Sequence, residues 1–178
     1  MPRVVADLTF TEDWFGEASQ KALARLFRSV RLIDGDVVEI GSWEGRSSVA
    51  LATAAAPAIV RCVDTWRGSP GEISAELAAE RDVFSTWQAN TAHLANVAAY
   101  RMGWREYAAS HIGATRLVFI DAEHTYEEVR DTIAAFRPHI VKGGVICGDD
   151  NHHPPVQRAV LEAFGDAHLE ATVWWVRV

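Results

Sequence analysis

Residues 37–48 constrain the fold more than any other segment, and they read Val-Val-Glu-Ile-Gly-Ser-Trp-Glu-Gly-Arg-Ser-Ser. A short apolar run ends at an acidic residue and enters a glycine-bounded loop before helix-forming sequence resumes. Gly41 and Gly45 permit a sharp turn that brings backbone amides, and the N-terminus of the following helix, towards a negatively charged ligand group. A dinucleotide fingerprint needs a second glycine where this chain has Trp43, so the loop indicates a nucleotide-type ligand other than NAD or FAD.

Strand-like and helix-like segments alternate from residue 17 onward, which is typical of an α/β fold with a mostly parallel central sheet. The apolar periodicity and the turn residues between segments set the expected elements. We expect helices over 17–30, 47–55, 73–94 and 126–136, with another beginning near Pro155, and strands over 36–40, 59–63, 97–102, 117–120 and 145–147. Helices should therefore cover both faces of one sheet.

The composition fits a single domain that spans residues 1–178, because a chain of this length buries roughly 70% of its unfolded surface. Its hydrophobic fraction of 49% and charged fraction of 23% are ordinary for a soluble globular protein. No apolar run approaches the ~20 residues of a membrane span, and no secretory signal is visible, so we expect a cytoplasmic protein. The net charge of -7 and the scattered basic residues disfavour nucleic acid as a partner.

Cys62 and Cys147 both fall in apolar runs assigned to strands of the same sheet. In the expected strand order they lie three strands apart, about 14 Å at ~4.8 Å per strand, beyond the ~7 Å limit between Cα atoms for a disulfide. We expect two buried free thiols.

The spacing from Glu39 to Gly45 is an acidic residue, one apolar residue, glycine, three residues and glycine. It resembles motif I of the class I S-adenosylmethionine-dependent methyltransferases. The resemblance implies a Rossmann-like fold, S-adenosylmethionine as cofactor and two antiparallel C-terminal strands. Residues 168–178 contain no turn residue, so we expect one of these two strands to be shortened or absent. Trp174 and Trp175 are expected to pack against a helix rather than to contact a ligand.

Asp64 stands at the end of the second expected strand and follows Gly41 by 23 residues. This is near the ~20-residue separation at which an acidic residue binds ribose hydroxyls, although a helix or turn cap is the alternative. In the related family an aromatic residue beside this acid packs against the nucleoside, which implies that role for Trp66. Trp104 follows the third strand, where many family members place an acidic adenine ligand; stacking on adenine and ordinary packing are equal alternatives.

Polar residues of the glycine loop complete the expected cofactor site. Glu39 would act indirectly, by orienting loop amides or the methionine amino group. Ser42, Ser47 and Ser48 can cap the helix and hydrogen-bond the methionine carboxylate, and capping alone is a sufficient reason for serine there.

Three carboxylates follow the last two parallel strands. Asp121 ends the fourth expected strand, and Asp149 and Asp150 end the fifth. Ligands of open α/β sheets bind at the carboxyl ends of the strands, so the three side chains should converge there. Two such charges 4 Å apart repel by ~4 kcal/mol at an effective dielectric constant of ~20, so the cluster needs raised pKa values or a cation. Oxygen ligands of this kind suit Mg²⁺, with Mn²⁺ and Ca²⁺ as alternatives.

Asp121 and His124, together with the Asp149-Asp150 pair, resemble the metal-dependent O-methyltransferases, in particular those that modify antibiotic sugars and the catechol-type enzymes. The resemblance implies that the three aspartates bind the metal and that His124 is the general base. A sugar hydroxyl is too weak an acid for a histidine of pKa ~6.5, and a bound metal closes that gap. We therefore predict divalent-metal-assisted O-methylation of a small hydroxylated metabolite, sugar or catechol-like.

Two other functions stay open at this point. One is a module that binds S-adenosylmethionine or S-adenosylhomocysteine without turnover, and the other is a metal-dependent hydrolase built on the same aspartates and histidine. His152 and His153 are interpreted as a solvated turn, with metal ligation or a second base as alternatives.

The cover of the site has no dedicated insertion in this sequence. We expect it to come from residues 1–16, from the segment 68–80 or from a neighbouring subunit of a homo-oligomer. Trp14, Phe15 and Trp43 are candidates for its walls, or equally for ordinary core.

Overall fold

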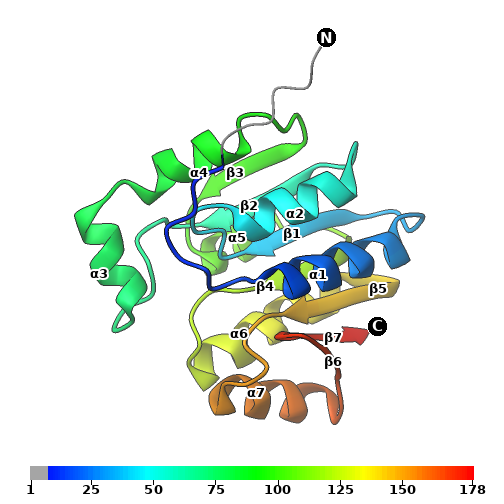
Figure 1. Cartoon of the computed structure of the whole chain (residues 1–178). Helices are drawn as coiled ribbons and strands as arrows, with labels where there is room; N and C mark the ends of the chain where they lie inside the picture. The colour runs from blue at the N-terminus through cyan, green and yellow to red at the C-terminus, as the bar shows by residue number, and fades with distance from the viewer. Residues whose placement is uncertain (1–7) are drawn as a thin grey trace.

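A computed structural model describes residues 8–178 of the chain (Figure 1). These residues form a seven-stranded sheet in the order β3-β2-β1-β4-β5-β7-β6. The strands are β1 (Asp36–Ile40), β2 (Val60–Asp64), β3 (Val97–Arg101), β4 (Thr115–Ile120), β5 (Ile140–Gly148), β6 (His168–Glu170) and β7 (Val173–Arg177). Strands β1 to β5 are parallel, whereas β7 runs antiparallel to both β5 and β6. The predicted α/β fold with a short antiparallel C-terminal edge is confirmed.

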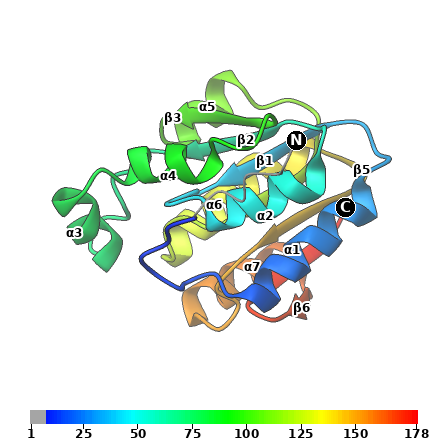
Figure 2. The same cartoon turned by 45° about the horizontal axis from the view of Figure 1, so that its top comes forward.

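Helices cover both faces of the sheet (Figures 1 and 2). On one face lie α1 (Glu17–Val30), α2 (Arg46–Ala55) and α4 (Val83–Thr91), and on the other lie α5 (Trp104–Ser110), α6 (Tyr126–Phe136) and α7 (Pro154–Phe164). Successive strand residues point to opposite faces, so Val37 packs in the first cluster and Val38 in the second. No helix among residues 8–178 is long and apolar enough to cross a membrane.

Helix α3 (Ile73–Glu80) differs from the others because it contains no buried residue and projects away from the sheet (Figure 2). The prediction of one helix over 73–94 is wrong at this point. Arg81 leaves the helical conformation, and the side chain of Asp82 accepts a hydrogen bond from the backbone N–H of Ser85, which starts α4 as a new helix. Helix α5 and the longer extents of β4 and β5 were likewise not predicted.

The C-terminal edge contains both antiparallel strands, with β6 shortened to three residues as expected. The turn between them uses Ala171 at φ 54, a left-handed conformation that sequence chemistry does not favour for alanine. Trp174 is buried in the same cluster as residues of α6 and α7. Cys62 on β2 and Cys147 on β5 are both buried and free, with β1 and β4 between their strands, as predicted.

The chain leaves β1 for β2 on one side and later returns to β4 on the other, so the strand order reverses between β1 and β4. Crevices at such a reversal are the usual ligand sites of open α/β sheets. Gly41 lies here at φ 86, and a Cβ atom on it would lie 1.8 Å from the carbonyl oxygen of Asp121. Gly41 is therefore required by the close approach of β4 as well as by the turn.

Candidate functional site

A cavity of about 760 Å³ lies at the carboxyl ends of the parallel strands. This volume is within the ~300–1,000 Å³ typical of small-molecule sites. Of the predicted site residues, Gly41, Ser42, Ser47, Asp64, Trp104, Asp121, His124, Asp149 and Asp150 line it. The structure thus brings the glycine loop and the aspartate cluster into one cavity.

Glu39 lies beneath the glycine loop and is fully buried. Its Oε2 atom accepts hydrogen bonds from the hydroxyl groups of Ser42 and Ser48. Burial raises the pKa of Glu39, and the serine hydrogen bonds oppose this rise. The prediction that the serines cap α2 is wrong: Gly45 is the N-cap residue and no side chain caps it, because two of the serine hydroxyls serve Glu39.

Asp64 is held by backbone amides of the loop. Its Oδ2 atom accepts from the N–H groups of Ser42 at 2.7 Å and Trp43 at 2.9 Å, and its Oδ1 atom accepts from Trp66 at 2.6 Å. A carboxylate offers about four lone-pair positions, so three are already used. Asp64 fastens the glycine loop to the end of β2 and retains capacity for roughly one further hydrogen bond into the cavity.

The two tryptophans predicted near the nucleoside differ in position. Trp66 is buried against Phe84 and Trp87 and donates its Nε1–H to the carbonyl oxygen of Trp43, so its indole supports the loop from behind and does not line the cavity. Trp104 lines the cavity, with its Nε1–H donated to Glu128 at 2.9 Å. Its ring is fixed in orientation before any ligand binds.

The aspartate cluster is strongly coupled by charge. Burial raises the pKa of Asp121 well above its usual range, and the charges of Asp149 and Asp150 raise it further. Burial also raises the pKa of Asp149 to about 6. Burial acts in the same direction on Asp150, but the hydrogen bond from His124 together with the charges of His124, His153 and His152 outweighs it, and the pKa of Asp150 is lowered overall. The cluster carries the mutual repulsion expected of carboxylates that share one site.

His124 lies between two carboxylates. Its Nε2 atom is 2.7 Å from Asp150 Oδ2, and its Nδ1 atom is 3.1 Å from Glu72 Oε1, which also accepts from the backbone N–H of His124. Burial alone would lower the pKa of His124, but the hydrogen bond and the negative charges around it raise the pKa to about 9. Glu72 precedes α3, so this projecting helix is connected to the aspartate cluster.

The residues present fit a divalent cation. Ligand atoms of Asp121, His124 and Asp150 lie within 4.8 Å of one another, as do those of Asp150, His152 and His153. Asp149 belongs to neither group, yet its Oδ1 atom is buried without a hydrogen-bond partner among the described residues. An orphaned buried carboxylate oxygen beside such donors is consistent with a place for a cation. His152 and His153 lie in the predicted turn, with side chains 59% and 44% exposed, and they also line the cavity.

A family model described as a methyltransferase domain matches residues 38–151, which is more than half of the chain. The chain belongs to the methyltransferase domain family. A search of curated proteins gives no match. The match to the family model supports the fold and S-adenosylmethionine as the cofactor, both of which motif I implies.

Solved structures share the fold of this methyltransferase at low sequence identity. The O-methyltransferase NovP is 19% identical with a TM-score of 0.70, and the alignment covers 91% of this chain and 80% of NovP. Cofactor-bound Rv0187 from MTB is 20% identical with a TM-score of 0.71, over 97% and 84% of the two chains. TomG from Streptomyces achromogenes, solved with S-adenosylmethionine, is 17% identical with a TM-score of 0.60, over 97% and 82%.

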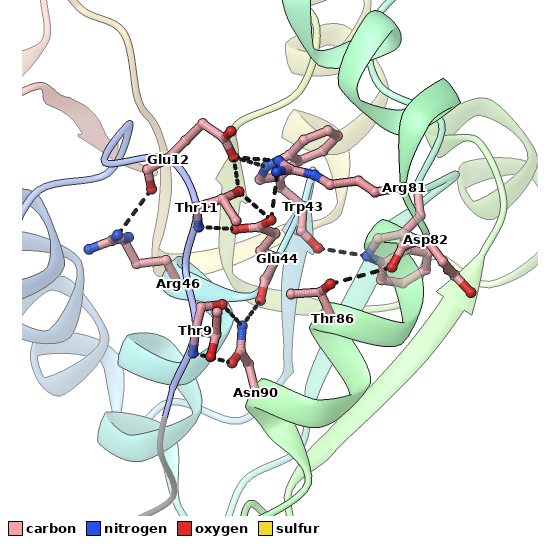
Figure 3. A network of polar contacts seen from close by, with 11 residues as sticks. Thr9, Thr11, Glu12, Trp43, Glu44, Arg46, Arg81, Asp82, Thr86 and Asn90 are labelled. Atoms are coloured by element: carbon pink, nitrogen blue, oxygen red, sulfur yellow. Dashed lines mark hydrogen bonds and ion pairs between the residues drawn. The ribbon is translucent and has the colours of Figure 1, made fainter.

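The N-terminal segment of the methyltransferase, residues 8–15, lies against the glycine loop (Figure 3). Its residues Phe10, Glu12, Trp14 and Phe15 form one wall of the cavity. Glu44 is buried and accepts from the backbone N–H of Thr11 at 2.8 Å and from its hydroxyl at 2.7 Å. Asn90 of α4 pairs with the backbone N–H and carbonyl groups of Thr9. Arg81 forms ion pairs with both carboxylates: its Nη2 atom lies 2.6 Å from Glu12 Oε2 and 3.2 Å from Glu44 Oε1. The part of the predicted cover that lies in residues 1–7 is outside the described residues.

Sequence reasoning on this methyltransferase missed three residues that position others: Glu44, Glu72 and Glu128. Glu44 carried a usable signal, since it is a charged residue between Trp43 and Gly45 in the loop expected to bind the ligand. Glu72 and Glu128 lie in a polar loop and on a solvated helix face, where acidic residues are ordinary.

Proposed function

We propose that this methyltransferase transfers a methyl group to a hydroxyl oxygen of a small acceptor with the help of a bound divalent cation, Mg²⁺ being the best match to the oxygen donors. The observation that carries the proposal is the convergence of Asp121, His124 and Asp150 in the cavity lined by the glycine loop. Several solved structures of this fold are titled O-methyltransferases, among them a TDP-rhamnose 3'-O-methyltransferase and a putative caffeoyl-CoA O-methyltransferase.

The cofactor would occupy the half of the cavity at β1 and β2. S-adenosylmethionine supplies a positively charged sulfonium methyl group as the electrophile. Ser47 and the backbone of Gly41 and Ser42 line this half, Asp64 offers its remaining lone pair to the ribose, and Trp104 presents a fixed ring for the adenine. Glu39 and Gly45 act indirectly, by holding the loop in shape. Trp66 supports the loop from the core and does not line the cavity, so it is not a nucleoside contact.

The acceptor would lie at β4 and β5. Asp121, Asp149 and Asp150 would hold the cation, which lowers the pKa of a hydroxyl group bound to it. With a cation held by the aspartates, the effect of the Asp150 charge on His124 would be offset, and the neutral imidazole would accept the hydroxyl proton at Nε2, the nitrogen that faces Asp150. Glu72 holds the opposite nitrogen and fixes the ring orientation. Trp14, Phe15 and Trp43 line the cavity and exclude water from a reaction that neutralises charge.

Calorimetry and a transfer assay with catechols and simple glycosides test the proposal. Asp121→Asn should abolish metal-stimulated formation of S-adenosylhomocysteine while leaving S-adenosylmethionine affinity within about twofold, because Asp121 would act on the acceptor half. Full activity after chelation of metals would refute the cation's role. Binding of the cofactor without transfer to any acceptor would indicate a binding module. Absence of cofactor binding under all metal conditions would favour a hydrolase.

A further inference from the structure

The charge of the cavity wall is strongly one-sided. In the acceptor half, the carboxyl groups of Glu72, Asp121, Glu123, Asp149 and Asp150 line the cavity, and the basic groups beside them are the imidazoles of His124, His152 and His153. Among residues 8–178, the same wall includes a single arginine, Arg46, and no lysine. A bound divalent cation and a protonated His124 would offset three of these carboxylate charges, so an excess of negative charge remains and an anionic ligand would still enter a cavity of like charge.

The guanidinium groups nearest the cavity are already engaged. Arg46 pairs with Asp13 at 3.1 Å, donates to the carbonyl oxygen of Glu12 and lies over the ring of Phe10. Arg81 is shared between the carboxylates of Glu12 and Glu44 (Figure 3). Breaking the contacts of Arg81 to bind a phosphate would leave the carboxylate of Glu44, which is 2% exposed, without its cation. Among residues 8–178, Arg46 is the only arginine that lines the cavity, and the one guanidinium nitrogen of Arg46 without a hydrogen-bond partner, Nε, is buried.

The mouth of the cavity presents an aromatic surface beside a carboxylate. Trp14 is 49% exposed, and its ring centroid lies 5.4 Å from that of Trp43. The Nε1 atom of Trp43 is 3.5 Å from Glu12 Oε2. Flat indole faces bind apolar ring faces, and they attract cations through the negative face of the ring. The surface thus favours a ring compound that is uncharged or positively charged.

We propose that the acceptor is a hydroxylated ring compound whose part entering the cavity is neutral or carries an amine, and that it bears no phosphate or carboxylate there. The inference rests on the proposed O-methylation and specifies its substrate class. By the same charge distribution, nucleoside diphosphate sugars and coenzyme A thioesters would be acceptors only with their phosphates outside the cavity. One uncompensated carboxylate at ~10 Å and an effective dielectric constant of ~20 gives a charge-dependent affinity difference of roughly tenfold.

Binding without turnover tests the charge preference directly. Two matched series of compounds are titrated calorimetrically into protein with S-adenosylhomocysteine and Mg²⁺. The three compounds of a series share one type of ring and are positively charged, neutral and negatively charged. The first series is dopamine, 4-methylcatechol and protocatechuate, and the second is glucosamine, methyl glucoside and glucuronate. In at least one series the amine and the neutral compound should bind at least roughly tenfold more tightly than the carboxylate. Equal or tighter binding of the carboxylates, or no binding in either series, overturns the proposal.

A conservative variant ties the preference to the cavity. Glu123 lines the cavity, and its carboxylate accepts from the hydroxyl of Thr125 at 3.1 Å, a bond that glutamine can retain. Glu123→Gln should narrow the ratio of the dissociation constants of protocatechuate and dopamine by roughly tenfold or more, because the two ligands differ by two charge units. Glu127→Gln, an equal charge change on the exposed face of α6, should leave this ratio unchanged. An identical ratio in both variants overturns the assignment to the cavity wall.

The two proposals fail separately in these experiments. Selective binding of the amines without methyl transfer would refute the proposed function and retain the charge preference. Methyl transfer to protocatechuate at a rate equal to that of dopamine would retain O-methylation and refute the charge preference.

Discussion

Gly41 is the residue at which the two halves of the cavity meet, since its backbone follows β1 and packs against the end of β4. Gly41→Ala should destabilise the protein by about 3 kcal/mol, because the left-handed conformation disfavours a Cβ atom and Asp121 leaves no room for it. Gly71 has a similar φ of 80 but no atom within 4 Å of a Cβ, so Gly71→Ala isolates the conformational cost at ~1 kcal/mol. Urea denaturation of both variants measures the difference, and equal losses would contradict the steric argument.

Asp64 offers a second test at this scale, because the structure gives it a role before any cofactor binds. Three backbone N–H groups donate to its two oxygens. Asp64→Asn should lower the stability of the cofactor-free protein by about 1–3 kcal/mol, since the amide nitrogen cannot accept from an N–H group. A residue that only bound ribose would leave the unfolding free energy without cofactor unchanged. Thermal or urea unfolding without ligand distinguishes the two roles.

At the scale of elements, the N-terminal segment behaves as a fixed wall anchored by buried polar groups. Glu44→Ala removes the acceptor of the Thr11 N–H and should raise hydrogen exchange at Thr11 by at least about tenfold, in keeping with the loss of a charged hydrogen bond. Glu80→Ala, on the exposed α3, serves as the matched control and should not change that rate. Unchanged exchange at Thr11 in the Glu44 variant would show that other contacts hold the segment.

The helices and strands were predicted correctly from the sequence where residues close together in the chain determine the local structure. The apolar face of α1 and the strand-loop-helix unit around Gly41 are determined by neighbouring residues, and both lie where expected. The break between α3 and α4 was missed because Asp82 sits in continuous helix-forming sequence, where its capping of Ser85 is a weak signal and the tertiary contacts of Arg81 are not visible. The left-handed turn at Ala171 was missed because alanine gives no turn signal.

In the candidate site, too, some features could be predicted from the sequence and others could not. Parallel strands must end at one edge, so the convergence of Asp121 and Asp150 followed from topology alone. The orientation of a side chain around its own bonds does not follow from topology. Trp66 was therefore placed on the nucleoside although its indole turns into the core, and the contact between Glu72 and His124 joins segments 52 residues apart, beyond the reach of any spacing rule.

At the scale of the whole molecule, the two cysteines report on global opening. Cys62 and Cys147 are both inaccessible in the cluster beneath α1 and α2, and burial raises the pKa of both thiols. Only the thiolate reacts with disulfide reagents, so the folded protein should resist modification by dithionitrobenzoate, and both thiols should react once the chain is unfolded in guanidinium.

The rate of thiol modification in the presence of cofactor tests whether the sheet unfolds cooperatively. If the sheet opens as one unit, S-adenosylmethionine at about 100 times its dissociation constant should slow modification of both thiols by roughly a hundredfold, because the ligand binds the folded state alone. Cys62 lies in the strand that ends at Asp64, whereas Cys147 lies in the strand that ends at the aspartate pair. A cofactor effect on Cys62 alone would show that β2 opens independently of β5, and that the cavity spans two units of different stability.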